Sequence, residues 1–163
     1  MASTPTFVRR RLKRLRRRQQ RELKVPTVIR SSAPFRFDAA LRIGGAGEEH
    51  QAIRDQTTLL PSYSHRKGDA IGKSRTAVKA EDIWILESPL GEAASLDHHL
   101  QWIWQTIAPH KEFFGTLLKK AKWANVCLGC LSESAYPVLQ VEAASLVLLR
   151  ELDLQLSFNF TCA

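Results

Sequence analysis

The sequence predicts an α+β domain, built as a two-layer sandwich of a four-stranded mixed sheet with about three helices packed mainly on one face. Segments with strand and helix periodicity alternate along residues 35–163, which indicates a sheet with helices between its strands. The first and last predicted strands, residues 35–43 and 154–161, each have one polar face. A strand with a polar face borders solvent on that side, so we expect helices on one face only.

The chain is expected to consist of a basic arm and linker, residues 1–34, and a single domain, residues 35–163. Residues 1–24 carry ten Lys or Arg and one acid, whereas the whole chain of 163 residues has 24 and 16. The remainder therefore has 14 basic and 15 acidic residues, so the formal net charge of +8 arises in the arm. A block of like charge repels itself and is expected to be disordered alone, or helical when bound to a polyanion.

The first half of the domain is predicted to contain a strand, a short helix and a long connection. Apolar and polar residues alternate over 35–43, and a glycine pair ends this strand. A helix is predicted over residues 48–60, closed by Pro61. Residues 62–79 are polar and long for a connection, so we expect a mobile loop, a hairpin or a functional insertion there.

The segment 82–121 is predicted to supply the centre of the core. Residues 82–87 form a strand with two apolar faces, which indicates a central strand or one covered on both sides. Ser95 is a suitable N-cap for the following helix. Pro109 cannot sit comfortably inside that helix, so we expect a break near residue 108 and a second helical segment after it.

The last third of the chain is predicted to add a strand, a helix and a final strand. The strand covers residues 123–132 and the helix covers residues 141–153. In the final strand, residues 154–161, every second residue is Leu or Phe. This period of two predicts that the row containing Phe158 points to one face, and its burial would stabilise the fold by roughly 1.5–3 kcal/mol per large side chain.

Three groups of residues contain the residue types found in metal, redox or anion sites. For each group we expect a role in the fold instead. His98 and His99 are about 100° apart on a helix and cannot chelate one metal together, so we expect packing at the helix–sheet edge. Cys127 and Cys130 have zinc or redox spacing, but in a strand they point to opposite faces and are expected to be buried. The glycine run 44–47 could present backbone N–H groups to an anion, but it matches no phosphate-binding signature and is expected to be a flexible turn. No metal or cofactor is predicted.

Two sets of residues are candidates for binding. An arginine-rich arm contacts phosphates without sequence preference, so nucleic acid or another polyanion is its expected partner. The candidate residues of the arm are Arg9, Arg10, Arg11, Lys13, Arg14, Arg16, Arg17, Arg18 and Arg21. A membrane-surface arm, a targeting or transit sequence and an unused tail are alternative interpretations. The candidate contacts for a protein partner lie in the long connection and are Tyr63, His65, Arg66, Lys67 and Asp69.

Several short segments of the domain match a known pattern. They are Leu41-Arg42-Ile43-Gly44, Pro61 leading to His65-Arg66-Lys67-Gly68-Asp69, Ile83-Trp84 with Ser88, Ser95-Leu96, His99-Leu100, and Leu146 to Leu156. With these residues the chain from about residue 35 onward resembles a small uncharacterised bacterial family, domain of unknown function family 4279. The resemblance implies a compact α+β domain with no established activity. Small families of this kind often accompany bacterial toxins as immunity proteins.

We therefore expect a non-enzymatic, cytoplasmic interaction domain that binds and blocks a protein partner, as an immunity-like or antitoxin-like protein does. The sequence contains no recognised catalytic signature. Its three cysteines are few and odd in number, which indicates reduced thiols of an intracellular protein. The first alternative is a nucleic-acid-associated protein that grips phosphate through the arm. A further alternative is an enzyme with an unfamiliar site at His65, His98 or His99.

Overall fold

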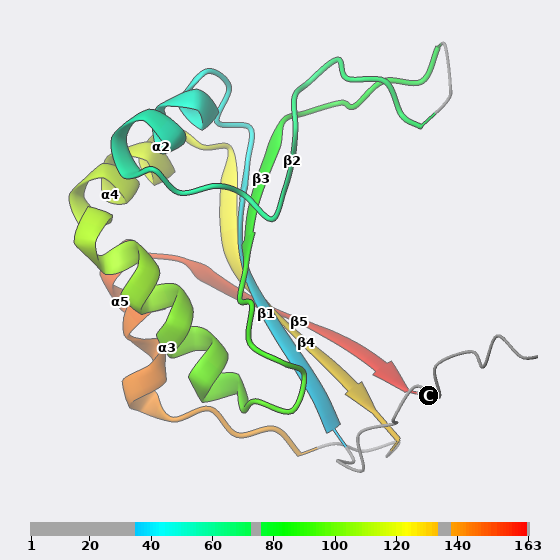
Figure 1. Cartoon of the computed structure of the whole chain (residues 1–163), viewed down its shortest axis with the longest axis vertical. Coiled ribbons are helices and arrows are strands. Elements are labelled where there is room, and N and C mark those ends of the chain that lie inside the picture. The colour runs from blue at the N-terminus through cyan, green and yellow to red at the C-terminus, as the bar shows by residue number, and fades with distance from the viewer. Residues whose placement is uncertain (1–34, 73–75, 134–137, 163) are drawn as a thin grey trace, which may run out of the picture. The chain divides into compact units, whose positions relative to one another are not determined.

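A computed structural model describes residues 35–72, 76–133 and 138–162 of the chain. These residues form a five-stranded mixed sheet in the order β2-β3-β1-β4-β5, together with four α-helices and two 3-10 helices (Figure 1). The predicted α+β class is thereby confirmed, and the sheet has one strand more than predicted. The additional strand is β2 (Tyr63–His65), which lies within the long connection. The predicted basic arm lies outside the residues described.

The sheet is built around β1 (Phe35–Gly44). This strand pairs in antiparallel fashion with β3 (Ile83–Glu87) on one side and with β4 (Trp123–Ser132) on the other. The outer strand β5 (Gln155–Cys162) runs parallel to β4. Parallel neighbours need a crossover connection, which here contains a 3-10 turn, η2, and helix α5.

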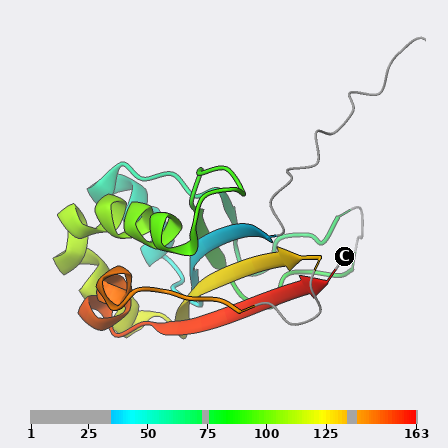
Figure 2. The same ribbon diagram turned by 90° about the horizontal axis from the view of Figure 1, so that it is seen from below.

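The helices lie on one side of the sheet, as predicted (Figures 1 and 2). They are α2 (Glu49–Thr57), α3 (Leu96–Ile107), α4 (Lys111–Lys120) and α5 (Val147–Leu152). Ser95 caps α3, because its hydroxyl accepts a hydrogen bond from the backbone N–H of His98 at 3.3 Å. The break expected near residue 108 is the 3-10 turn η1 (Ala108–His110), which contains Pro109. The last helix is shorter than predicted, because η2 (Ala143–Leu146) precedes it.

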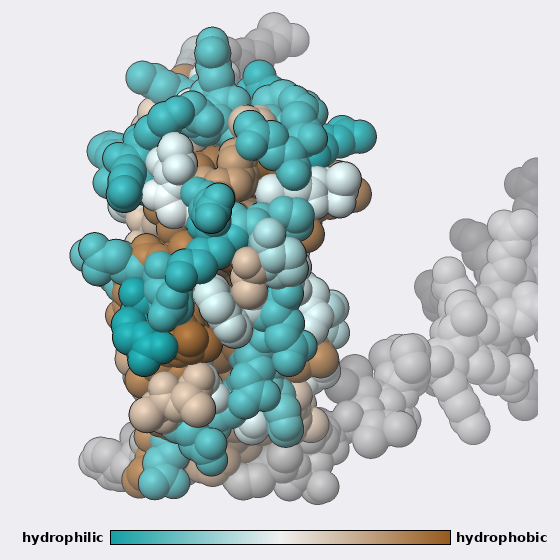
Figure 3. Space-filling view, turned by 90° about the vertical axis from the view of Figure 1, so that its left-hand side faces the viewer, coloured by the Kyte–Doolittle hydropathy of each residue, from teal (hydrophilic) through white to brown (hydrophobic). Residues whose placement is uncertain are grey.

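The core lies between the helices and the covered face of the sheet. Its largest fully buried side chains are Phe114, Leu41, Ile43, Ile53, Leu100, Ile103, Ile107, Leu117, Leu128, Leu148, His99 and Val126. On the outer side of the helices, hydrophilic side chains predominate and hydrophobic ones show between them (Figure 3). Within the described residues, no helix has the length and apolar character needed to cross a membrane.

The position of β3 corrects one detail of the prediction. The middle strand is β1, and β3 lies between β1 and the short edge strand β2. Trp84 and Leu86 point to the core and are buried, whereas Ile83 and Ile85 lie half-buried on the opposite face. The helices lie on the other side of the sheet (Figure 2), and on this face Ile85 is paired in register with Tyr63 of β2.

The burial predicted for the final strand is wrong at its outer end. Leu154 and Leu156 pack against the core, but Phe158 and Phe160 are 45% and 54% exposed. Their rings stack on each other with centroids 5.9 Å apart. The strands extend beyond the helical layer, so the outer half of the apolar row has no helix above it (Figure 2).

Candidate functional site

The long connection folds into β2 and a hairpin that projects from the end of the sheet (Figure 1). We call residues 66–79 the hairpin; its residues 73–75 lie outside the described part of the chain. Its two arms exchange backbone hydrogen bonds, from the N–H of Gly68 to the carbonyl of Lys79 at 2.9 Å and from the N–H of Lys79 to the carbonyl of Asp69 at 2.8 Å. Ala70 and Val78 add an isolated antiparallel bridge. Of the three expectations for this segment, the hairpin is the one observed.

Hydrophobic side chains are exposed along β2, the hairpin and the residues just before them. Leu60, Tyr63, Ile71 and Val78 are 63%, 48%, 45% and 54% exposed. They are four of the eight large hydrophobic side chains that are exposed in the described residues. The segment 60–78 therefore concentrates the apolar surface that the fold leaves uncovered.

A cavity of about 370 Å³ lies between α2, β2 and the base of the hairpin. We call it the α2–hairpin cavity. Its lining residues are His50, Gln51, Arg54, Leu60, Pro61, Ser64, His65, Arg66, Asp69 and Trp84. Three of the five residues predicted to contact a protein, His65, Arg66 and Asp69, meet here. The other two, Tyr63 and Lys67, are exposed and do not line the cavity.

A buried carboxylate, that of Asp82, contacts the N-terminal end of α2 and the turn before it. One of its oxygens, Oδ2, accepts a hydrogen bond from the backbone N–H of Gly47 at 2.9 Å. His50 Nε2 lies 2.9 Å from the same oxygen, in a close polar contact that is poorly directed for a hydrogen bond. The glycine run is thus a turn, as expected, and the anion that its backbone faces belongs to the protein itself.

The glycines of this turn are required by its backbone conformation. Gly45 and Gly47 have φ values of +68° and +60°, in the left-handed region that glycine adopts without strain. The N–H of Gly45 also donates to the backbone carbonyl of Asp82 at 3.0 Å. Two backbone N–H groups therefore tie the turn to the residue that precedes β3.

The charges around the α2–hairpin cavity are unevenly paired. Burial lowers the pKa of His50, the carboxylate of Asp82 opposes this, and nearby Arg66 and His65 lower the pKa further. Neither Arg54 nor Arg66 forms a side-chain ion pair within the described residues. The arrangement can therefore receive an anionic group.

The other chemically suggestive residues have structural surroundings. His99 is fully buried, and its Nδ1 lies 3.0 Å from the hydroxyl of Ser88, whereas His98 is exposed and contacts its own N-cap, Ser95. Burial also lowers the pKa of His99. The predicted packing of His99 is observed, with the side chain of Ser88 as its polar neighbour.

The two strand cysteines lie on opposite faces of β4, as predicted. In the sheet register Cys130 is opposite Phe37 and Cys127 is opposite Ala40, and both cysteines are buried. Burial raises the pKa of the Cys130 thiol. Among the residues that the structure describes, no three His, Cys, Asp or Glu side chains lie close enough together to hold a metal ion.

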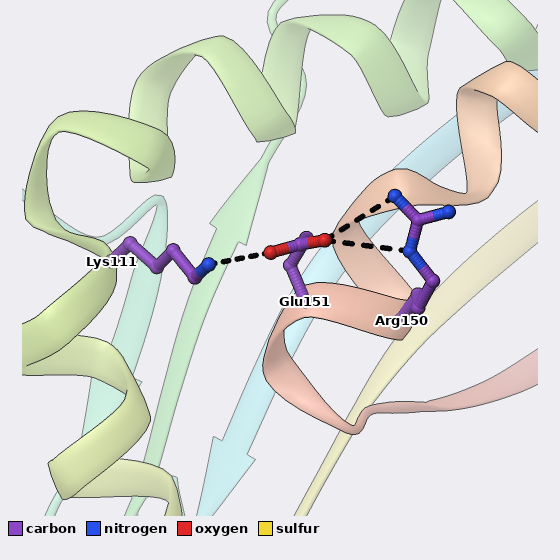
Figure 4. A network of polar contacts seen from close by, with 3 residues as sticks. All are labelled: Lys111, Arg150 and Glu151. Carbon is purple, nitrogen blue, oxygen red and sulfur yellow. Dashed lines mark hydrogen bonds and ion pairs between the residues drawn. The ribbon is translucent and has the colours of Figure 1, made fainter.

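A larger cavity, of about 730 Å³, lies between α4, α5 and the first residues of β4 and β5. Three of its four basic lining residues have acidic partners. Lys111 Nζ lies 2.5 Å from Glu151 Oε2, and Arg150 Nη2 lies 3.3 Å from Glu151 Oε1 (Figure 4). Lys122 similarly pairs with Glu81 at 3.1 Å. Since its charges are largely neutralised internally, this cavity is a weaker candidate than the α2–hairpin cavity.

Sequence reasoning missed three residues of the candidate site, His50, Arg54 and Asp82. His50 and Arg54 are four residues apart in a predicted helix, a spacing that places both side chains on one face. That spacing could have indicated a polar helix face directed at a neighbour. Nothing local pointed to Asp82, because its partners lie more than thirty residues earlier in the chain.

The chain belongs to the family described as domain of unknown function DUF4279, whose family model matches residues 34–163. No curated protein and no solved structure matches the chain.

Proposed function

We propose that the domain binds a protein partner through β2 and the hairpin, without catalysing a reaction. The observation that carries the proposal is the exposure of Leu60, Tyr63, Ile71 and Val78 along one connected segment. Apolar side chains that are exposed together typically mark a site of protein–protein contact. Tyrosine in addition is among the residues that contribute most to binding energy at such sites.

The backbone of β2 supports the same proposal. This strand is an edge of the sheet and pairs only with β3 among the described strands. An extended segment of a partner can add to such an edge through main-chain hydrogen bonds. The charged side chains of Arg66, Lys67 and Asp69 follow directly along the chain and would form the polar rim of the contact.

Within this function we propose an immunity-like or antitoxin-like role in the cytoplasm. A protein of this kind blocks its partner by occupying a surface and needs no chemistry of its own. The cytoplasmic location is favoured by the unpaired thiols of Cys127, Cys130 and Cys162, which are typical of a reducing compartment.

Affinity capture with the full chain tests the proposal. The variant Ile71→Ser/Val78→Ser removes two exposed apolar side chains of the hairpin, and Val138→Ser is the matched control because Val138 is 85% exposed outside it. We expect a protein that co-purifies with the parent and with the control but is lost from the double variant. The proposal is wrong if no protein co-purifies, or if the double variant retains the partner.

Contact with nucleic acid is a second candidate function, favoured by the ten basic residues among residues 1–24. It predicts binding to a DNA or RNA duplex that weakens steeply as salt rises, because each neutralised phosphate releases counterions. The affinity should disappear when residues 1–24 are removed. Equal binding by the shortened chain would eliminate the arm as the binding element.

A further inference from the structure

Two arginines from different elements line the α2–hairpin cavity without a carboxylate partner. Arg54 comes from α2 and Arg66 from the residue after β2, and neither takes part in an ion pair within the described part of the chain. In the larger cavity, by contrast, Arg150 is paired with Glu151. A guanidinium group presents a planar fork of donors that fits the paired oxygens of a carboxylate or phosphate.

The carboxylates near this cavity are held by the backbone of the protein. Asp69 lines the cavity, and its Oδ2 accepts a hydrogen bond from the backbone N–H of Arg66 at 2.6 Å. Asp82 lies behind His50 and accepts from Gly47. The lining thus contains two guanidinium groups and one carboxylate, while the second carboxylate, that of Asp82, lies behind His50.

Neutral donors and apolar walls complete the cavity. Ser64 and Gln51 add a hydroxyl and an amide, and His65 has a buried Nδ1 without a hydrogen-bond partner in the described residues. Pro61 and Trp84 add apolar side chains to the lining.

We infer that the α2–hairpin cavity is a binding site for an acidic group, a carboxylate or a phosphate, held between Arg54 and Arg66. The volume of about 370 Å³ is at the lower end of the range for ligand sites and suits one small anion or one acidic side chain. If the group belongs to a protein partner, the inference rests on the proposed function. If the acidic group belongs to a free small molecule, the inference is independent of that function.

A titration of the full chain with sodium phosphate and with sodium acetate tests the site without any partner. Backbone and arginine side-chain NMR signals are followed at constant pH, with sodium chloride added at the same ionic strength as the control. We expect shifts that saturate with at least one of the two anions and centre on α2 and residues 64–69. The variants Arg54→Gln and Arg66→Gln should each weaken the apparent affinity about tenfold, and Arg150→Gln should leave it unchanged.

The inference is overturned if neither anion saturates the shifts, or if the two cavity variants titrate like the parent protein. Affinity capture with Arg54→Gln then distinguishes the two sources of the acidic group. Loss of the partner assigns the group to the partner, and retention assigns the site to a free anion. Because the titration uses no partner, its failure leaves the hairpin proposal standing, and failure of the capture leaves the anion site standing.

Discussion

Replacing Asp82 by alanine should lower the free energy of unfolding by about 1.5–3 kcal/mol. The Asp82 and His50 side chains are 10% and 8% exposed, so water compensates little for the lost carboxylate. The backbone N–H of Gly47 loses its acceptor at 2.9 Å, in a part-buried hydrogen bond to a charged group of the kind that contributes about 1.5–3 kcal/mol.

Urea denaturation at pH 7.5, followed by circular dichroism, measures this effect as a shift of the midpoint at constant slope. Asp82→Asn keeps an acceptor for Gly47 and should lose about half as much stability. Asp55→Ala is the control. Asp55 is an exposed acid on α2, the helix that contains His50, and its loss should change stability by less than about 0.5 kcal/mol. If Asp82→Ala unfolds at the same urea concentration as the control, the carboxylate does not anchor the glycine turn.

Two further predictions concern packing and pH. Gly44→Ala should destabilise the fold by about 1–3 kcal/mol in thermal or urea melts, because the new Cβ would lie 2.2 Å from the ring of Trp123. Gly91→Ala is the control, since no atom lies within 4 Å of its new Cβ. Equal stability of the two variants would contradict the packing argument. Burial lowers the pKa of His50 and of His99 below 6.5 in the folded state, so the unfolded state binds more protons in acid. Stability should therefore be complete above pH 6.5 and fall as the pH drops below it; a urea midpoint at pH 5.5 equal to or above that at pH 7.5 would refute this assignment.

One part of the candidate site could be predicted from the sequence, because it depends on residue types within a single short segment. Residues 62–79 are polar, glycine-containing and bounded by Pro61, which marked them as a surface segment with His65, Arg66 and Asp69 exposed to a partner. The cavity itself could not be predicted, since its second wall is α2. Whether His50 and Arg54 face that segment depends on how α2 packs against the sheet, and no local pattern records that orientation.

The sequence by itself determined the α+β class, the placement of helices on one face and the break at Pro109, because these depend on periodicity and backbone chemistry within short segments. Only the tertiary structure decided the strand order, the parallel pairing of β5 with β4 and the position of β1 in the middle of the sheet. Periodicity shows which side of an element is apolar, but it does not show which neighbour covers that side. The row ending in Phe158 and Phe160 illustrates the difference: its pattern is uniform, yet the helical layer covers only the inner half. The contact between His50 and Asp82 likewise exists only because the fold brings α2 against the start of β3.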